Sequence, residues 1–162
     1  MRTGEICYSD TRRLPFESVL ALYRANALGA AEKPEQLHKA LIGSHSVITA
    51  WDGEELVGLG NALSDSALVV YYSHILVLPA YQRRGIGSEI MRRLMARYQG
   101  FHQHVLICNG RGLVKFYEKC GFTRANRMHS MWIYDGPTLR ANLAGNGSAS
   151  RPASGRPGTR VT

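Results

Sequence analysis

Residues 67–98 read ALVVYYSHILVLPAYQRRGIGSEIMRRLMARY, and their pattern changes twice along the stretch. Residues 67–78 are rich in Val, Tyr, Ile and Leu, which predicts the longest strand of the chain. Pro79 ends this strand, because proline cannot donate a hydrogen bond to a ladder. From Ile86 onward the spacing is that of an amphipathic helix. Its apolar face holds Ile86, Ile90, Met91, Leu94, Met95 and Tyr98, and its polar face holds Arg92, Arg93 and Arg97.

A glycine loop, Gln82-Arg83-Arg84-Gly85-Ile86-Gly87-Ser88, joins this strand to this helix. The first N–H groups of a helix lack intrahelical acceptors and the helix dipole is positive there, so a pyrophosphate can dock. The two glycines allow a ligand close to the backbone, and the two arginines add positive charge. An isolated Gly-x-Gly is more often ordinary turn chemistry. The loop also lacks the endings of a phosphate loop and of a dinucleotide fingerprint, which argues against a nucleoside triphosphate or NAD.

Periodicity and turn residues place further elements around this unit. Strands are expected at residues 4–10, 46–50, 56–63 and 105–108, with a final strand at 128–134 and a brief one near Phe122. Helices are expected at residues 16–28, 34–43 and 113–120. Asp52-Gly53 is a strong hairpin signal between two of the strands.

Length and composition fit one folded domain, with 162 residues of which 44% are hydrophobic and 20% charged. We expect this domain to span residues 1–140. Residues 141–162 are expected to form a disordered tail, because large apolar residues do not recur there at any structural period. The three cysteines, Cys7, Cys108 and Cys120, are odd in number and have no Cys-x-x-Cys spacing, which indicates reduced thiols.

The formal net charge of +8 favours a polyanionic partner such as nucleic acid, an acidic membrane or a phosphorylated cofactor. The N-terminal residues carry charges where a signal peptide needs an apolar region, and no apolar stretch approaches the ~18 residues of a membrane span. A cytoplasmic location is therefore expected.

Two motifs resemble the GNAT N-acetyltransferase superfamily. Residues 82–87 match the Gln/Arg-x-x-Gly-x-Gly/Ala signature that binds the coenzyme A (CoA) pyrophosphate, and residues 115–122, KFYEKCGF, resemble the late Phe-Tyr-x-x-x-Gly-Phe helix. The resemblance covers about residues 4–134. It implies an α/β (α+β) fold with a GNAT-like mixed central sheet of about six to seven strands flanked by helices. It also implies an acyltransferase that moves an acetyl group from acetyl-CoA directly to a primary amine.

The resemblance assigns roles to individual residues. The long strand is expected to splay near Ile75, Leu76 and Val77, where a backbone N–H would hold the thioester oxygen. Tyr117 would protonate the CoA thiolate, and Asn109 would bond the pantetheine arm. The pyrophosphate would be held by Gln82, Arg83, Arg84, Gly85, Ile86, Gly87 and Ser88.

The proton acceptor is less constrained. Many relatives place a glutamate on the long strand, whereas residues 67–78 contain no carboxylate, and His74 is the only group there that titrates near neutral pH. A histidine in an apolar strand is more often a core residue with its hydrogen bonds satisfied, and a water wire along Tyr71, Tyr72 and Ser73 is the alternative to a catalytic His74. His102, His104 and Cys108 make an incomplete ligand set, so no metal is expected.

Shorter segments such as Ala50-Trp51-Asp52-Gly53 are similar to the small-amine (serotonin/arylalkylamine type) branch of the superfamily, so the expected partner is a small-molecule amine. A protein lysine or N-terminus is the alternative acceptor, and a CoA-binding module without activity is the alternative function. A nucleic-acid binder is disfavoured because no RNA motif or recognition helix accompanies the arginines. We expect no nucleic-acid or membrane partner, and the resemblance leaves a homodimer open.

Overall fold

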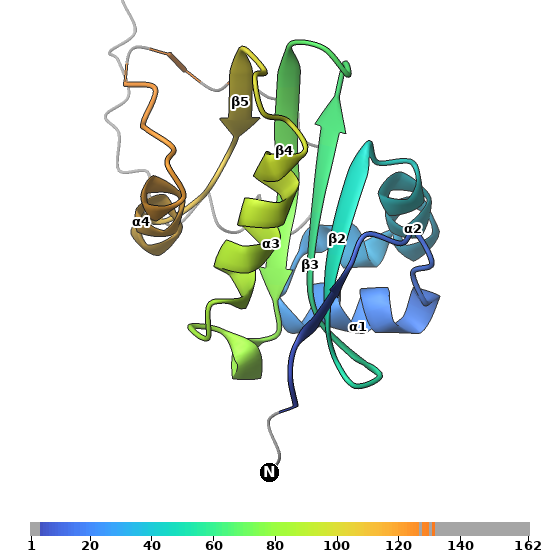
Figure 1. Cartoon of the computed structure of the whole chain (residues 1–162). Helices are drawn as coiled ribbons and strands as arrows, with labels where there is room; N and C mark the ends of the chain where they lie inside the picture. Colours follow the sequence, from blue (N-terminus) through green and yellow to red (C-terminus); the bar gives the residue numbers. More distant parts are fainter. Residues whose placement is uncertain (1–3, 127, 130, 132–162) are drawn as a thin grey trace, which may run out of the picture.

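The computed structural model describes residues 4–126, 128, 129 and 131. Within them a mixed five-stranded sheet runs in the order β1-β2-β3-β4-β5 (Figure 1). The strands are β1 Cys7–Ser9, β2 Ser46–Asp52, β3 Glu55–Ser64, β4 Val69–Val77 and β5 Gln103–Leu106. Neighbouring strands are antiparallel except β4 and β5, which are parallel. The predicted class is confirmed, with fewer strands than the six to seven expected.

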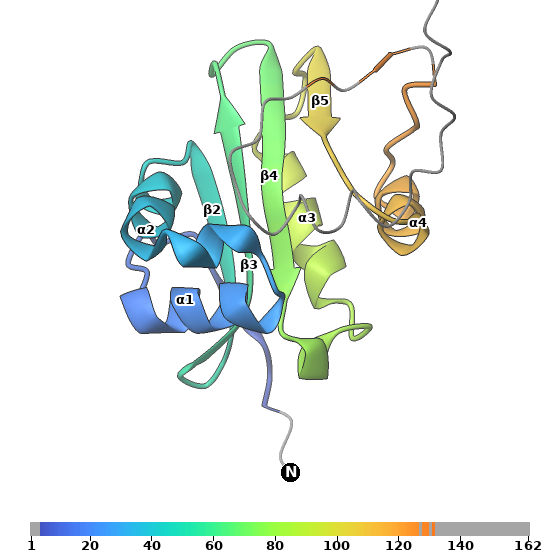
Figure 2. The same ribbon diagram turned by 180° about the vertical axis from the view of Figure 1, so that it is seen from behind.

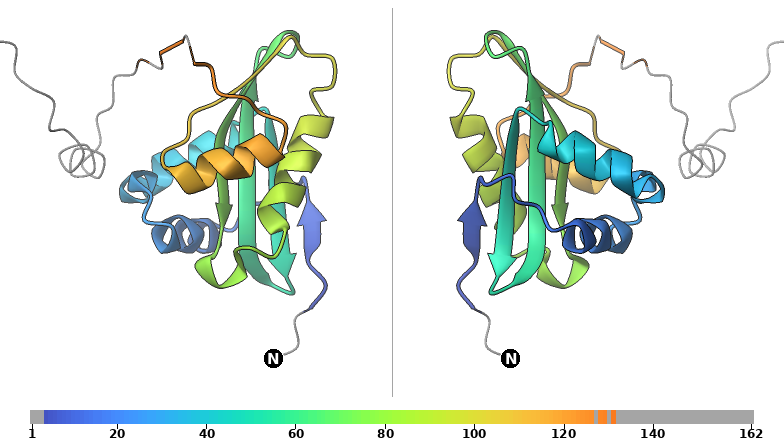
Figure 3. Two further views of the ribbon diagram at one scale, coloured as in Figure 1. Left: turned by 90° about the vertical axis from the view of Figure 1, so that its left-hand side faces the viewer. Right: turned by 90° about the vertical axis from the view of Figure 1, so that its right-hand side faces the viewer.

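Helices cover both faces of this sheet. They are α1 Phe16–Ala25, α2 Pro34–Ile42, α3 Ile86–Ala96 and α4 Arg111–Lys119, with short 3-10 helices η1 Gly29–Glu32 and η2 Pro79–Tyr81. Helix α3 lies against one face (Figure 1), and α1 and α2 lie against the other (Figure 2). Helix α4 lies beside the β5 edge of the sheet (Figure 1), and in the edge-on views of Figure 3 it crosses the sheet between α3 on one side and α1 and α2 on the other. None of the helices among the described residues is long and apolar enough to cross a bilayer.

The predicted strand near Phe122 does not form, because the backbone there closes helix α4. Gly121 has φ +98° and donates its N–H to Glu118 O at 3.1 Å, while the Phe122 N–H bonds Tyr117 O at 3.0 Å. This pair is a Schellman motif, which uses an N–H that a ladder would need. Of the predicted final strand, residues 128, 129 and 131 are not in a strand, and the rest lies outside the described residues, as does the predicted tail from residue 141.

Two boundaries also differ from those expected. Helix α1 ends at Ala25 rather than near Leu28, because Ala27 has φ +52° and leaves the helical conformation. Strand β5 begins earlier than expected, at Gln103, whose N–H donates to Leu68 O at 3.0 Å. Both differences depend on backbone contacts rather than on side-chain periodicity.

Helix α3 sits close to the sheet because β3 presents glycine beneath it. A Cβ on Gly60 would lie 2.5 Å from Ile90 Cγ2, 2.8 Å from Ile75 Cδ1 and 3.0 Å from Leu94 Cδ1. Such distances leave no room for a methyl group without movement of α3. The core on this side includes Ile48, Ala50, Val57, Ala62, Val70, Ile86, Ile90, Met91 and Leu94, all buried. Gly60 therefore sets the depth of the helix that begins at the glycine loop.

We predict that Gly60→Val lowers the free energy of unfolding by ~1–3 kcal/mol, the usual cost of overpacking a filled core. Chemical denaturation measures the change. Gly112→Ala is the matched control: Gly112 lies in α4 with nothing within 4 Å of an added Cβ. The control should not lower stability, since alanine favours helix over glycine. A Gly60→Val protein as stable as the wild type would contradict the close packing described here.

Candidate functional site

Strands β4 and β5 separate part of the way along β4. They pair only from Val69 with Gln103 to Tyr72 with Leu106, whereas β4 continues, paired with β3, to Val77. Beyond Leu106 the chain leaves the sheet toward α4 (Figure 1). The outer edge of β4 after Tyr72 therefore has no strand partner among the described residues, and backbone hydrogen-bonding groups face a gap.

A β-bulge lies where the separation begins. On β3, Asn61 lies opposite His74 and Ala62 lies opposite Tyr72, so Ser73 is left without a partner. An extra residue of this kind reverses the alternation of the strand, so the edge to which each backbone N–H points changes after it.

The alternation beyond the bulge determines which N–H groups face the gap. Leu78 donates its N–H to Val57 O on β3 at 2.9 Å. Because orientation alternates in an antiparallel pair, the N–H of Leu76 also points to β3, and those of Ile75 and Val77 point to the open edge. Of the three residues predicted to supply the N–H for the thioester oxygen, Ile75 and Val77 therefore face the gap and Leu76 does not.

A side chain replaces the missing ladder contact at the bulge. The backbone N–H of His74 donates to Asn61 Oδ1 at 3.1 Å. Asn61 in turn donates from Nδ2 to Ser44 Oγ at 3.0 Å, and Ser44 donates to Ala40 O at 2.9 Å. This chain of hydrogen bonds links the bulge to the end of helix α2.

The His74 ring packs against helix α1. Its Nδ1 lies 3.0 Å from the hydroxyl of Tyr23, and the two rings meet edge to face. Burial raises the pKa of the Tyr23 phenol and lowers the pKa of the His74 imidazole, so both are neutral at pH 7. This contact fits either tautomer of the neutral imidazole, because the Tyr23 hydroxyl can donate to Nδ1 or accept from Nδ1–H.

The loop that leads to α3 is anchored to the β2–β3 hairpin. The hydroxyl of Tyr81 donates to Asp52 Oδ2 at 3.1 Å and Glu55 Oε2 at 3.0 Å. The hydrogen bond to Glu55 is the main reason that the pKa of Tyr81 rises to about 12. Arg84 lies over the Tyr81 ring at 4.9 Å, and Gln82 Nε2 donates to Val77 O at 3.1 Å. The side chain of Gln82 thus bonds the open edge of β4.

The glycine loop turns its backbone N–H groups toward solvent. Arg83 and Gly85 have φ of +60° and +84°, and Gly85 caps α3 without a side-chain hydrogen bond. Alternation of left- and right-handed residues at a helix start forms an anion-binding concavity. Glu89 in the first turn is ionised, because Arg92 and then Arg93 lower its pKa to about 2, and these two arginines compensate its negative charge. Positive potential therefore remains at the start of the helix.

Gly87 is not explained by the packing of the protein. Its φ is not positive, and an added Cβ would meet only Phe116 and Val77 side-chain atoms at 3.5–3.6 Å, ordinary contact distances. Gly85, by contrast, needs glycine for its left-handed backbone. A glycine at position 87 therefore points to a ligand that approaches the backbone closely.

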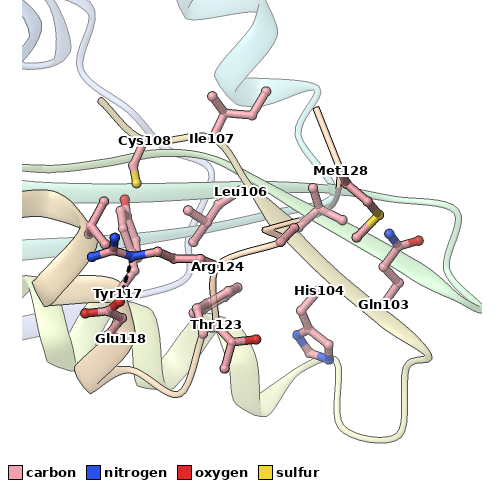
Figure 4. A pocket seen from close by; sticks show the side chains of 14 residues that line it. Gln103, His104, Leu106, Ile107, Cys108, Tyr117, Glu118, Thr123, Arg124 and Met128 are labelled. Atoms are coloured by element: carbon pink, nitrogen blue, oxygen red, sulfur yellow. Dashed lines mark hydrogen bonds and ion pairs between the residues drawn. The ribbon is translucent and has the colours of Figure 1, made fainter. Parts of the chain in front are cut away.

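Tyr117 on α4 lies beside the end of β5. Figure 4 shows its ring extending toward Cys108. Burial, with smaller effects of Cys108, Cys120 and Tyr71, raises the pKa of Tyr117 to about 12, so the phenol is protonated at neutral pH. Asn109 follows in the exposed loop between β5 and α4. Tyr117 also lines a cavity of about 350 Å³ bounded by β5, α4 and residues 122–125 (Figure 4).

A second cavity, of about 590 Å³, lies between α3 and α4. It begins at Ser88 in the first turn of α3, and two cations, Arg92 and Lys119, line it. The described lining residues include no carboxylate. This groove continues the positive region of the glycine loop, whereas the first cavity contains no residue of that loop.

No three His, Cys, Asp or Glu side chains within the described part of the chain are grouped as metal ligands. Of the incomplete ligand set His102, His104 and Cys108, His104 has another partner: its Nδ1 lies 2.8 Å from the hydroxyl of Tyr72. That contact uses one hydrogen-bonding position of the Tyr72 hydroxyl, so Tyr72 can still bind a water, as the predicted wire through Tyr71, Tyr72 and Ser73 requires.

Three further residues lie at the site and were not predicted from the sequence: Tyr23, Asn61 and Tyr81. Tyr23 reads as one apolar position on a helical face, and Tyr81 as part of a loop. Asn61 carries a usable signal, because an amide in an otherwise apolar strand must find hydrogen-bond partners when buried. Its partner at the bulge is not readable from local pattern.

Comparison with known proteins agrees with this geometry. A sequence profile described as "Acetyltransferase (GNAT) domain" matches residues 43–124. A GNAT family acetyltransferase from Streptococcus pneumoniae is 30% identical, with a TM-score of 0.71 over 80% of this chain and 98% of that one. A probable acetyltransferase from Staphylococcus aureus is 23% identical, with a TM-score of 0.72 over 81% and 100%.

A more distant structure is that of AAC(6')-Iy in complex with the bisubstrate analog CoA-S-monomethyl-acetylneamine. It is 15% identical, with a TM-score of 0.57 over 83% of this chain and 99% of that one. No protein with a curated description matches the sequence.

The buried His74 predicts a pH dependence of stability. Its pKa is lower in the folded protein than the ~6.5 of an unfolded histidine. Below that pH the unfolded chain binds a proton that the native ring resists, so stability should fall as the pH drops below about 6.5 and level off under the folded pKa. Denaturation of wild type and His74→Asn across pH 5–8 measures this, since Asn keeps an acceptor for Tyr23.

The slope should be smaller in His74→Asn than in the wild type. His102→Gln, which changes an exposed histidine, is the control and should follow the wild-type profile. Identical slopes for wild type and His74→Asn would show that His74 is not held neutral by burial.

Proposed function

The chain belongs to the GNAT acetyltransferase family, and from this premise we propose that it transfers acetyl from acetyl-CoA directly to a primary amine of a small molecule. The observation that carries this proposal is the gap between β4 and β5. Backbone N–H groups of Ile75 and Val77 face this gap, and the glycine loop follows directly after the end of β4. Acetyl-CoA bound along β4 would have its phosphates at the glycine loop and its thioester carbonyl at these two N–H groups.

Acetyl-CoA would bind along a continuous path. The N–H groups of Gly85, Ile86, Gly87 and Ser88, with Arg83 and Arg84, suit the pyrophosphate. The groove from Ser88 past Arg92 and Lys119 suits the phosphate-bearing adenosine end, because it is cationic and lies directly beside the loop. The pantetheine arm would run along the open edge of β4 toward Asn109, and the thioester would reach the bulge.

In the reaction, the amine nitrogen attacks the thioester carbon, the C–S bond breaks and the CoA thiolate departs. The carbonyl oxygen gains negative charge, which the N–H of Ile75 is placed to stabilise. Binding both reactants in a near-attack pose supplies a further ~7 kcal/mol or more. No covalent enzyme intermediate is needed.

His74 is the proposed acceptor for the amine proton. An alkylamine has a pKa of about 10.4, so it must lose a proton before it attacks. To accept a proton at Nε2, the neutral imidazole must carry its own proton on Nδ1, where the Tyr23 hydroxyl would accept it. A water wire through Tyr71, Tyr72 and Ser73 is the alternative carrier.

Tyr117 would donate to the departing thiolate. With a pKa of about 12 the phenol is a weaker acid than a thiol of pKa ~8.5, so full proton transfer from Tyr117 to the thiolate is uphill. It would act mainly as a hydrogen-bond donor to sulfur as charge develops, and the proton released by the amine would neutralise the thiolate afterwards.

A small molecule is proposed as acceptor over a protein amine partly because AAC(6')-Iy, with this fold, binds an analog that joins CoA to acetylneamine. The CoA-binding module without activity remains as the second candidate, because no carboxylate lies on β4 where a base is common. Binding without turnover would favour it.

We predict that saturating acetyl-CoA raises the melting temperature, since a ligand at 100 times its Kd adds ~2.7 kcal/mol to stability. Gly87→Glu should abolish the rise, because it puts a carboxylate where the pyrophosphate binds. Ala21→Glu adds the same charge on the exposed side of α1 and should retain it. Free-thiol release with polyamines, arylalkylamines, aminoglycosides and lysine peptides then identifies the acceptor. No thermal shift in the wild type would sink the assignment.

We predict that Tyr117→Phe lowers kcat by ~100-fold, the usual contribution of a positioned proton donor. The ring and its packing against Phe122 are kept, so the melting temperature and acetyl-CoA affinity should change little. Tyr8→Phe removes a phenol from β1, at the far edge of the sheet, and should leave kcat unchanged. A Tyr117→Phe enzyme of normal kcat, measured where chemistry limits the rate, would remove Tyr117 from the mechanism.

A further inference from the structure

A single buried amide lies opposite the bulge of β4. Asn61 is 5% exposed in the middle of β3, where its neighbours Gly60 and Ala62 face the α3 side of the sheet. Burial of a side-chain amide is unfavourable unless its donors and acceptor are paired. Asn61 meets this condition through two hydrogen bonds, one to Ser44 after α2 and one from the backbone N–H of His74 at the bulge.

The orientation of this amide is determined by its neighbours. Ser44 is fully buried and its hydroxyl donates to Ala40 O at 2.9 Å, so toward Asn61 it accepts. The NH₂ of Asn61 therefore faces Ser44, at 3.0 Å, and Oδ1 faces the N–H of His74, at 3.1 Å. Helix α2, strand β3 and strand β4 are joined by this chain.

The contact with His74 compensates for the bulge. Because of the bulge, the His74 N–H points toward β3, where the unpaired Ser73 interrupts the regular ladder and Asn61 Oδ1 is the acceptor. Without Asn61 Oδ1 the N–H would be buried without an acceptor, which is costly. Replacing Asn61 by an apolar residue would thus favour a strand without the bulge.

Loss of the bulge would change the edge to which later N–H groups point. A shift of one residue inverts the alternation of the strand. The N–H of Ile75, which now faces the gap, would turn toward β3. The side chain on β3 thereby affects a donor that it does not touch.

We propose that Asn61 is a positioning residue for acetyl transfer, which holds the Ser73 bulge and so aims the Ile75 N–H at the thioester oxygen. This inference rests on the function proposed above. It differs from a role in stability alone, because it concerns the polarisation of a bound carbonyl. The thioester C=O stretch reports that polarisation directly and needs no knowledge of the amine.

The experiment is isotope-edited infrared spectroscopy of acetyl-CoA labelled with ¹³C at the carbonyl, bound to the full chain without an amine. In the wild type the stretch should move to lower frequency than in free acetyl-CoA, as a hydrogen-bonded carbonyl does. In Asn61→Leu that shift should be lost although acetyl-CoA still binds, since the glycine loop is untouched. With an acceptor amine, kcat should fall on the order of 100-fold, as when an oxyanion donor is removed.

Two variants separate positioning from packing. Ser44→Ala removes the support of the amide but leaves Oδ1, so it should lose stability and keep the carbonyl shift. Asn61→Asp keeps an acceptor oxygen for His74, and the Ser44 hydroxyl can turn to donate to the second oxygen, so it should recover most of the shift. If Asn61→Leu does not fold, Asn61→Ser replaces it, because its hydroxyl is too short to reach His74.

A wild-type carbonyl shift that persists in Asn61→Leu or Asn61→Ser would overturn the positioning role and leave the proposed function intact. Acetyl-CoA that binds the wild type without any carbonyl shift would also overturn it, because no N–H would then polarise the thioester. Failure of acetyl-CoA to bind the wild type, measured by calorimetry, would instead reject the proposed function itself.

Discussion

Strand β5 stops pairing with β4 at Leu106 while β4 remains paired with β3 as far as Val77, and the site depends on this unequal pairing. Exposed ladder groups are normally a liability on a strand edge. Here the edge is short, and one of its carbonyls is already bonded by the side chain of Gln82. The remaining donors face the gap, and α3, which glycine on β3 lets approach closely, covers the sheet face beside it. The same contacts that complete the fold therefore leave a narrow row of N–H groups free.

Anchoring of the glycine loop matches the gap to the anion site. Tyr81 bonds Asp52 and Glu55 of the β2–β3 hairpin, so the loop is tied to the strands next to β4 rather than to its own helix. The two carboxylates are engaged with this phenol, and Glu89 is neutralised by Arg92 and Arg93. Negative charge near the helix start is thus compensated, and the backbone N–H groups remain the dominant feature there. A ligand that bound both the loop and the gap would be held at two anchored positions along β4, which favours reaction by proximity.

Most of the fold and part of the site follow from local sequence. The strand, glycine loop and helix of residues 67–98 were predictable because proline, glycine and a change of period mark each transition. The ends of α1 and β5 were not, since Ala27 and Gln103 act through backbone contacts. The prediction of a strand near Phe122 was wrong, because the Schellman motif at the end of α4 uses the backbone N–H of Phe122. The roles of Tyr23 and Asn61 depend on pairing across the sheet and on the bulge at Ser73, which no local pattern encodes.

The two faces of β4 divide the proposed chemistry between them. Ile75 and Val77 pack on the α3 side, next to the glycine loop, whereas Leu76 belongs to the core of α1 and α2, where the His74 ring meets Tyr23. If acetyl-CoA enters from the side of α3 and α4, His74 lies on the opposite face, and the amine must approach from α1 and η1. The two reactants then meet only in the gap itself. Burial favours a neutral His74 and a protonated Tyr23, so a lasting charge on this pair would be unfavourable. On that face Ala30 and Ala31 of η1 pack against the same core as Leu76, so an amine that approached from there would meet small apolar side chains.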